Sequence, residues 1–205
     1  MKKRIPLIII GFISLIVLGY AALMISSMFY DKSNPRNRPN SYLVEVEVEV
    51  KKPVQYVYRF VKYQKPELYK DLHGMHDQFK ILNADGLVKG AEIECSEGDD
   101  EDLIYHRYRV TEDIENKLIQ YESKPSIIYD QETKKKIGKC NVYVYYDFIK
   151  LDPDRTMLKQ TVVIDMLNPL YKLIGDIIGK ISGSRDIWDK QFQEELDSLK
   201  TYIEK

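Results

Sequence analysis

Histidine is the side chain best suited to acid–base chemistry near neutral pH, and this sequence holds three. His106 lies in the segment 102–110 (DLIYHRYRV), where alternate positions share one face if the segment is a strand. Arg107 and Arg109 suit the wet face, which turns His106 and Tyr108 toward the interior. We interpret both as ligand-binding residues in a cavity. His106 is also the candidate catalytic acid or base, but binding is favoured because no partnering nucleophile is visible.

The other two histidines, His73 and His76, are spaced H-x-x-H around Gly74. Such a pair could ligate a metal ion if a third ligand, such as His106, came near. The alternative, which we favour, is two exposed or hydrogen-bonding turn residues with the glycine supplying the bend. No HExxH motif or metal-spaced cysteine pair is present, so we expect neither a metal site nor a cofactor.

Two further alternating segments offer polar groups for the head of a ligand. Tyr146 belongs to the inward set of residues 139–150, and Gln160 to that of residues 155–166. Each could hydrogen-bond a ligand carbonyl or hydroxyl, or could equally be a buried group satisfied by a neighbour. Trp188 is expected in the core or in the cavity wall, and the two interpretations are compatible.

The remaining reactive or charged groups have plain structural interpretations. Cys95 and Cys140 are expected to be buried free thiols, with a disulfide left open if the domain lies outside the cytoplasm. The five acids of residues 97–102 predict a solvated hairpin turn rather than a calcium site, because the EF-hand spacing is absent. Residues 134–136, three lysines, predict a solvated loop rather than a lipid-headgroup patch.

The elements that must position these side chains begin at Ser41. Four valines alternate with three glutamates over residues 44–50, the period-2 pattern of a strand with one buried face. Two short helices are expected over 54–61 and 66–73, the second with Pro66 in its first turn. Six strands with short connections follow and predict an antiparallel meander; they cover residues 77–82, 89–95, 102–111, 116–123, 139–150 and 155–166.

The chain ends in an amphipathic helix, whose apolar residues from Ile187 to Ile203 recur at a spacing of three to four. A long helix of this kind can cover the buried face of an antiparallel sheet and leave a cavity between them. The segment 168–183 has a glycine at every fourth position from Gly175. It is either the first part of this helix or a mobile apolar lid beside the cavity mouth.

The N-terminal thirty residues differ from the rest of the chain. Residues 5–30 carry no charge, and the run is long enough at about 1.5 Å per residue to cross a bilayer core. It is too long for a signal-peptide core and lacks a good cleavage site. We therefore predict a single-span membrane anchor (1–30), a polar linker (31–40) and a domain (41–205). Three basic residues before the run favour a cytoplasmic N terminus with the domain on the extracytoplasmic side.

Charge and motifs exclude several function classes. The 31 Lys and Arg nearly cancel the 32 Asp and Glu, so the totals give no support for a basic nucleic-acid surface. A Walker loop, a GxGxxG motif, a GxSxG elbow and a CxxC pair are all missing from the sequence. Nucleotide binding, α/β-hydrolase chemistry and thioredoxin-type redox chemistry are therefore unsupported.

The element order resembles the START-like (SRPBCC) superfamily of polyketide cyclase-like, helix-grip domains over about residues 42–205. The resemblance rests on three segments: VEVEVEVKKPVQYVYRFV, GLVKGAEIECSE and WDKQFQEELDSLKTYIEK. It implies an α+β helix-grip fold, with a curved seven-stranded antiparallel sheet (β-α-α-β6-α) around the C-terminal helix. It also implies a cavity for an apolar or amphipathic small molecule, in a family where some members are enzymes and many only bind or carry.

Three functions remain open from the sequence. The first is a membrane-anchored domain that binds a lipid, quinone or polyketide-like molecule between sheet and helix. The second is a cyclase- or hydratase-like enzyme that uses His106 as acid or base. The third is a structural or protein-interaction module whose cavity is filled by side chains.

Overall fold

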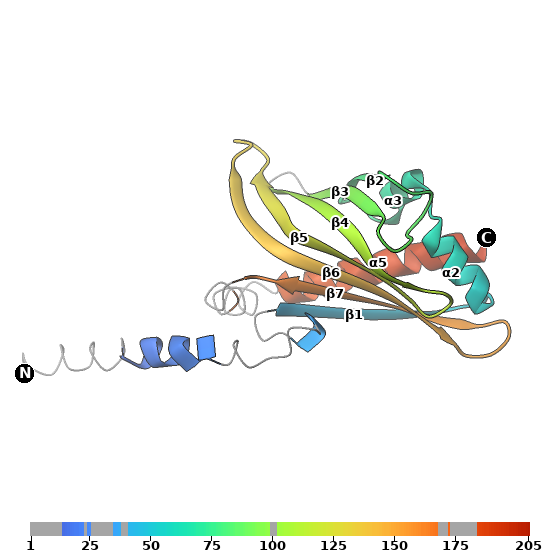
Figure 1. The fold of residues 1–205 in the computed structure, drawn as a ribbon, viewed down its shortest axis with the longest axis horizontal. Helices are drawn as coiled ribbons and strands as arrows, with labels where there is room; N and C mark the ends of the chain where they lie inside the picture. The colour runs from blue at the N-terminus through green and yellow to red at the C-terminus, as the bar shows by residue number, and fades with distance from the viewer. Residues whose placement is uncertain are drawn as a thin grey trace, which may run out of the picture.

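The computed structural model describes residues 14–22, 24–25, 35–37, 41–98, 102–167, 172 and 184–205. The described residues form an α+β fold in which one large, curved antiparallel sheet carries a long C-terminal helix (Figure 1). The helix-grip architecture expected from the sequence is therefore confirmed.

Seven strands pair in the described sheet: β1 (Ser41–Val50), β2 (His76–Ile81), β3 (Glu92–Gly98), β4 (Asp102–Ile114), β5 (Leu118–Asp130), β6 (Lys136–Lys150) and β7 (Thr156–Asp165). Their order is β1-β7-β6-β5-β4-β3-β2, and every neighbouring pair is antiparallel. The predicted six-strand meander is thus β2 to β7. The first strand joins it by pairing with the last.

The alternation in β1 separates the two faces of the sheet. Val44, Val46 and Val48 are buried, whereas Glu45 and Glu47 between them are exposed. Successive side chains of a strand point to opposite faces, so one face enters the core while the other stays in water. Burying apolar surface stabilises the fold by about 25 cal/mol per Å². A shift of one residue would expose the valines and bury the glutamates, so their burial determines the register of this strand.

Strand β5 continues well beyond residue 123, where the sequence pattern predicts its end. Its register with β6 shifts between Ser123 and Ser126, around Pro125. Proline cannot donate a ladder hydrogen bond, so an irregularity at this point lets the strand continue past it. Because the alternation breaks at this irregularity, the sequence pattern does not reveal that the strand continues. Ser126, directly after it, is fully buried next to the cavity described below.

Three described helices complete the domain: α2 (Val54–Lys62), α3 (Pro66–Leu72) and α5 (Ser184–Glu204). The first two match the predicted ranges to within one residue. On α5, Leu196, Leu199 and Ile203 are almost fully buried in the main core. In Figure 1, α2 and α3 lie at the end of the sheet near the C terminus, and α5 runs across one face. The amphipathic C-terminal helix therefore covers the sheet as expected.

A smaller apolar cluster lies around Tyr145 and Val163, separate from the main core. The 3₁₀ turn η1 (Pro35–Asn37), within the predicted linker, packs beside it. The guanidinium carbon of Arg36 lies 4.1 Å from the Tyr145 ring centroid, and its Nη2 is 2.8 Å from Asp147 Oδ2. Part of the outer face of the sheet is thus covered rather than wet.

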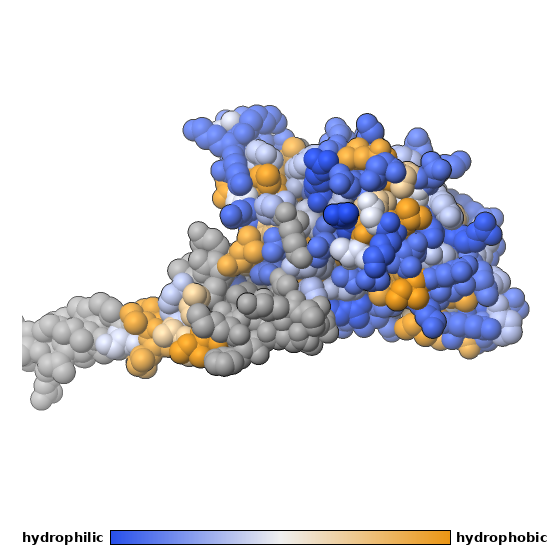
Figure 2. Space-filling view, viewed as in Figure 1, coloured by the Kyte–Doolittle hydropathy of each residue, from blue (hydrophilic) through white to orange (hydrophobic). Residues whose placement is uncertain are grey.

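The predicted single-pass membrane location, with the domain on the extracytoplasmic side, is wrong, and the structure gives no support for an anchor over residues 5–30. Among the described residues, no helix is both long enough and apolar enough to cross a bilayer. Residues 14–22 and 24–25 are helical, and Leu15 to Leu18 are each more than half exposed. Figure 2 shows these apolar side chains together, beside a domain surface that is largely hydrophilic in this view. The rest of the predicted span lies outside the described residues, as does the proposed lid of 168–183 apart from Lys172.

Candidate functional site

A cavity of about 330 Å³ lies between the sheet and α5. Its volume is at the lower end of the range for small-molecule sites. Apolar side chains make up most of the wall, including Phe79, Val142, Val144, Val162, Ile164 and Phe192. Side chains do not fill this space, which argues against the interaction module with a filled cavity.

All five predicted ligand-binding residues line this cavity. His106, Tyr108, Tyr146 and Gln160 are each at most 5% exposed. Trp188 lies in the wall rather than in the core, because it is 38% exposed and meets Tyr42 edge-on at a centroid distance of 5.9 Å. The alternation along the strands therefore identified the four polar residues that the sheet contributes to this part of the cavity wall.

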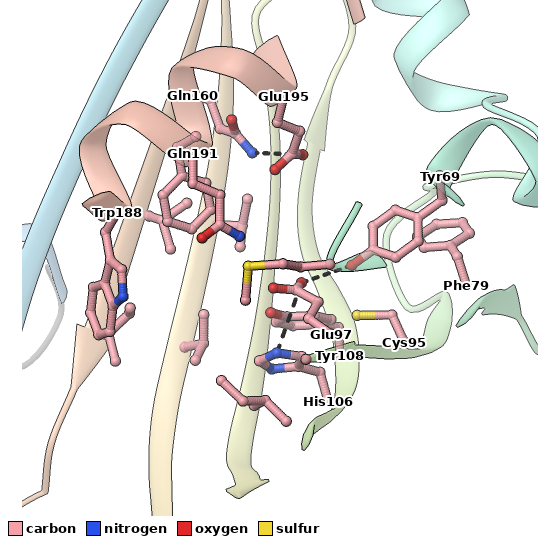
Figure 3. Close-up of a pocket in the computed structure, with 18 of the residues that line it drawn as sticks. Tyr69, Phe79, Cys95, Glu97, His106, Tyr108, Gln160, Trp188, Gln191 and Glu195 are labelled. Carbon is pink, nitrogen blue, oxygen red and sulfur yellow. Dashed lines mark hydrogen bonds and ion pairs between the residues drawn. The ribbon is translucent and has the colours of Figure 1, made fainter. Parts of the chain in front are cut away.

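Polar side chains from strands and helices meet at this cavity, and all but His76 are labelled in Figure 3. We call this group the cavity cluster; its members are Tyr69, His76, Glu97, His106, Gln160 and Glu195. The first comes from α3 and the last from α5, while the other four come from β2, β3, β4 and β7. Tertiary packing, rather than a local motif, assembles the cluster.

Glu97 is the centre of one half of the cluster. Its Oε1 accepts a hydrogen bond of 2.7 Å from the Tyr69 hydroxyl and lies 3.9 Å from His106 Nε2. The other ring nitrogen of His106, Nδ1, is 2.7 Å from Ser126 Oγ. His106 stacks on Tyr108 at a centroid distance of 4.9 Å. The imidazole is therefore oriented from two sides, while its buried Nε2 has no hydrogen-bond partner among the described residues.

Glu195 is the centre of the other half. Its Oε2 lies 3.6 Å from His76 Nε2, and its Oε1 is 3.5 Å from Gln160 Nε2, which also donates to the Tyr146 hydroxyl at 3.1 Å. His76 Nδ1 is 2.8 Å from the carbonyl of Tyr69. Because a carbonyl can only accept, Nδ1 carries the proton in neutral His76, and Nε2 presents a lone pair toward Glu195.

Burial keeps this half of the cluster uncharged. It raises the pKa of Glu195 to about 8, an effect that nearby Glu97 increases and the Gln160 hydrogen bond reduces. Burial also lowers the pKa of His76 and of His106, against the attraction of Glu97. The contact between His76 and Glu195 is beyond hydrogen-bond distance, so burial outweighs ion pairing for both. Near neutral pH the site thus holds a carboxylic acid beside two neutral imidazoles.

The described cavity wall contains carboxyl side chains and no basic ones, although burial keeps the carboxyl of Glu195 protonated near neutral pH. Glu97, Asp102 and Glu195 line it, and no described lysine or arginine does. A bound anion would find no cationic partner there, whereas a hydrogen-bond donor or a cation would find carboxyl oxygens. The wall is therefore electrostatically selective even though it is mostly apolar.

The H-x-x-H pair does not converge on a common point. The His73 and His76 ring centroids are 6.0 Å apart, and each ring has its own neighbours. His73 Nδ1 accepts from the Met75 amide and Nε2 lies 3.9 Å from Glu194, whereas buried His76 stacks on Tyr69. The pair therefore behaves as hydrogen-bonding residues, although no pattern in the sequence indicated that His76 belongs to the cavity cluster.

Besides His76, three members of the cluster were missed, and a signal existed for two of them. Glu97 was assigned to the acidic turn, yet it continues the period-2 set of Ile93 and Cys95. Glu195 is a charged residue of an amphipathic helix and would ordinarily be expected in water, yet it lies three residues after Phe192 and four before Leu199. Tyr69 carried no comparable signal. Both cysteines are free and buried as expected, and both line the cavity.

No protein-family model matches the sequence, and no curated protein matches it closely enough to count as a relative. Solved structures with a similar fold include a norcoclaurine synthase point mutant in complex with a transition-state analogue, from Thalictrum flavum. It is 12% identical, with a TM-score of 0.54 over 80% of this chain and 94% of that one. A hypothetical protein from Helicobacter pylori is 15% identical, with a TM-score of 0.53 over 79% and 88%.

The major latex-like protein 151 from Panax ginseng is 3% identical, with a TM-score of 0.52 over 80% of this chain and 98% of that chain. Similarity at such low identity concerns the backbone and not the site residues. The neighbours therefore support the helix-grip fold that the sequence resemblance implied.

Proposed function

We propose that this domain binds an amphipathic small molecule in the cavity between the sheet and α5. The observation that carries the proposal is an apolar cavity of about 330 Å³ into which buried polar groups with unused hydrogen-bonding capacity project. His106 Nε2 and Gln160 Oε1 are both buried without a hydrogen-bond partner among the described residues. Unpartnered buried polar atoms are costly, and a ligand head can satisfy them.

The apolar body of the ligand would lie against the valines and aromatic rings of the wall. Each Å² of apolar ligand surface removed from water contributes about 25 cal/mol, less the cost of immobilising the ligand. The head would lie at the cavity cluster, where Gln160 and His106 offer acceptors and the Tyr146 hydroxyl a further polar contact. Lipid-, quinone- and polyketide-like molecules with one polar end fit this division.

The carboxyl side chains of the wall further restrict which head groups the ligand can have. A hydroxyl or an amine can donate to Glu97 or to the carboxyl of Glu195, and an ammonium group would also favour ionisation of Glu195. A carboxylate head would instead approach Glu97 and Asp102 with no compensating cation in the described wall. The proposed ligand is therefore a neutral or cationic amphiphile rather than a fatty-acid-like anion.

Two measurements on the purified chain test the binding function. Mass spectrometry of solvent extracts should identify a co-purified amphiphile, and the neutral dye N-phenyl-1-naphthylamine should bind with enhanced fluorescence. Val142→Phe places a ring in the cavity and should weaken dye binding at least about tenfold, which is 1.4 kcal/mol. Val142→Ile is the matched control and should retain most of the affinity. Equal dye binding by both folded variants would contradict the proposed location.

A second candidate function is acid–base catalysis by His106. The observation that favours it is the free, buried Nε2 facing the cavity on a ring whose other nitrogen is held by Ser126. If His106 moves protons, the ligand extracted from the wild-type protein should take up deuterium in heavy water. His106→Gln should abolish that exchange while dye affinity stays within about twofold. Exchange that persists in His106→Gln would exclude this role.

A further inference from the structure

We propose that Cys95, Glu97 and His106 form a zinc-binding site in the wall of the cavity. Their ligand atoms, one sulfur, one carboxylate oxygen and one imidazole nitrogen, all lie within 4.8 Å of one another. Ligand atoms on a tetrahedral zinc ion are roughly 3.5 Å apart at ordinary Zn–S, Zn–N and Zn–O lengths. Small side-chain rotations would therefore close the group around an ion.

Strand pairing fixes this arrangement. Cys95 and His106 are direct partners across β3 and β4, and Glu97 lies two residues beyond Cys95 on the same face of β3. Side chains of paired residues start about 5 Å apart, and alternate residues of one strand share a face. The three donors therefore occupy adjacent positions on the paired strands β3 and β4.

The surrounding hydrogen bonds already orient the donors as a metal site requires. His106 Nδ1 lies 2.7 Å from Ser126 Oγ, and in the tautomer in which Nδ1 donates to this hydroxyl the lone pair is on Nε2, the atom that faces Glu97 and has no hydrogen-bond partner among the described residues. The Tyr69 hydroxyl holds Glu97 Oε1 at 2.7 Å. Ligating histidines and carboxylates in proteins commonly have such outer partners, which fix the ring orientation and the tautomer.

The donor set favours zinc over magnesium or calcium. A thiolate and an imidazole are ligands of zinc and related transition metals, whereas magnesium and calcium take oxygen ligands almost entirely. Three protein donors leave a fourth position, and it opens toward the cavity. This site goes beyond the amphiphile-binding function, because a zinc ion with water in its fourth position could bind there without any amphiphile.

Metal titration of the purified chain, without any amphiphile, tests the proposal. We expect one equivalent of Zn²⁺ to bind and to raise the melting temperature. We expect Co²⁺ to give an intense near-ultraviolet sulfur-to-cobalt band. Cys95→Ser should remove that band and weaken Zn²⁺ more than about 100-fold, and Glu97→Gln, at the more exposed position, should weaken it roughly tenfold.

Cys140→Ser is the matched control, because Cys140 is also a buried free thiol in the same cavity. It should leave the cobalt band and zinc affinity unchanged, with circular dichroism confirming that each variant is folded. If Cys95→Ser does not fold, Glu97→Gln decides the question. Absence of the band in the wild-type protein, or a band lost in Cys140→Ser but kept in Cys95→Ser, would overturn the proposal. Dye binding is measured separately, so the two proposals can fail independently.

Discussion

Two clusters of polar side chains in this molecule differ in burial and in organisation: the charged side chains of the first are part-buried, whereas most members of the second are almost fully buried. The first, which we call the α2 cluster, consists of Tyr58, Lys62 and Asp113. Lys62 Nζ lies 2.7 Å from Asp113 Oδ2 and 3.0 Å from the Tyr58 hydroxyl, and the hydroxyl donates to Asp113 Oδ1. The second is the cavity cluster, which combines two glutamates with two neutral histidines and contains no lysine or arginine.

We interpret the first cluster as structural and the second as a candidate ligand site, because only the first has a partner for every charged group. In the α2 cluster a cation meets an anion, and each charged atom has a partner. Burial alone would lower the pKa of Lys62, but the hydrogen bonds from Lys62 to Asp113 and Tyr58 reverse the shift and raise it. In the cavity cluster burial prevails, the carboxyl of Glu195 stays protonated near neutral pH, and His106 Nε2 is left without a hydrogen-bond partner among the described residues. Buried groups with shifted pKa values and unpartnered polar atoms are typical of ligand-binding and catalytic sites.

The largest expected effect comes from breaking the balanced cluster. Asp113→Ala leaves the part-buried ammonium of Lys62 without its anion, and we expect the free energy of unfolding to fall by about 2–4 kcal/mol. Denaturant unfolding measures the loss. The affinity of the folded variant for N-phenyl-1-naphthylamine should not change, and an affinity loss as large as that of Val142→Phe would show that the two regions are coupled.

The next effect concerns the pH dependence of stability. Because the folded pKa of Glu195 is about 8 and its ordinary value is 4.5, the folded state binds more protons in this interval. The stabilisation is complete below about pH 4.5 and is lost as pH rises through about 8, which amounts to about 2–3 kcal/mol between about pH 6 and pH 9. Glu195→Gln should remove this component.

Unfolding of the wild-type and Glu195→Gln chains at both pH values provides the measurement. His76 and His106 are present in both proteins, so their opposite contribution, a loss of stability as pH falls, cancels in the difference. Parallel pH profiles for the two proteins would contradict an uncharged, buried Glu195.

The sequence predicted much of this fold, because local patterns encode it. The valine alternation located β1, and the spacing of apolar residues located α5. Alternation along β4 also turned His106 and Tyr108 inward, as the structure shows. The apolar run of 5–30, by contrast, led to a predicted anchor that the structure does not support.

The rest of the site depends on long-range packing. Glu195 and Tyr69 reach the cavity from helices far apart in the sequence, and a charged residue on a helix is ordinarily expected in water. Ser126 reaches His106 only because β5 continues past Pro125 through a shift in its pairing. The spacing of Glu195 from Phe192 and Leu199 indicates the helix face that it shares, but no local pattern encodes its partners, so the contacts of the second half could not be predicted.

A smaller effect is expected at the partner that orients His106. Ser126→Ala leaves His106 Nδ1 buried without its acceptor, which should cost about 1 kcal/mol of stability. Zinc affinity should fall by about tenfold, since the ring is no longer held for coordination. Ser123→Ala, at a fully buried serine near the same irregularity, serves as the control for zinc affinity. Equal loss of zinc affinity in both variants would mean that Ser126 acts only through general packing.

The smallest effect is expected at an exposed ion pair. Lys89 and Glu112 lie 3.1 Å apart, with side chains that are 66% and 45% exposed. Glu112→Gln should change the free energy of unfolding by less than about 0.5 kcal/mol, because water screens the pair. Denaturant unfolding of this variant sets the baseline for charge removal. A change comparable to that of Asp113→Ala would remove the distinction between buried and exposed polar groups.

Competition between matched amphiphiles tests the central claim most directly. Decylamine, decanol and decanoate share one apolar chain and differ only in the head group, so the cavity cluster alone should rank them. We predict that, in the metal-free protein, decylamine and decanol displace N-phenyl-1-naphthylamine at concentrations at least about tenfold lower than decanoate. Equal or tighter binding of decanoate would contradict an acidic cavity that selects neutral or cationic amphiphiles.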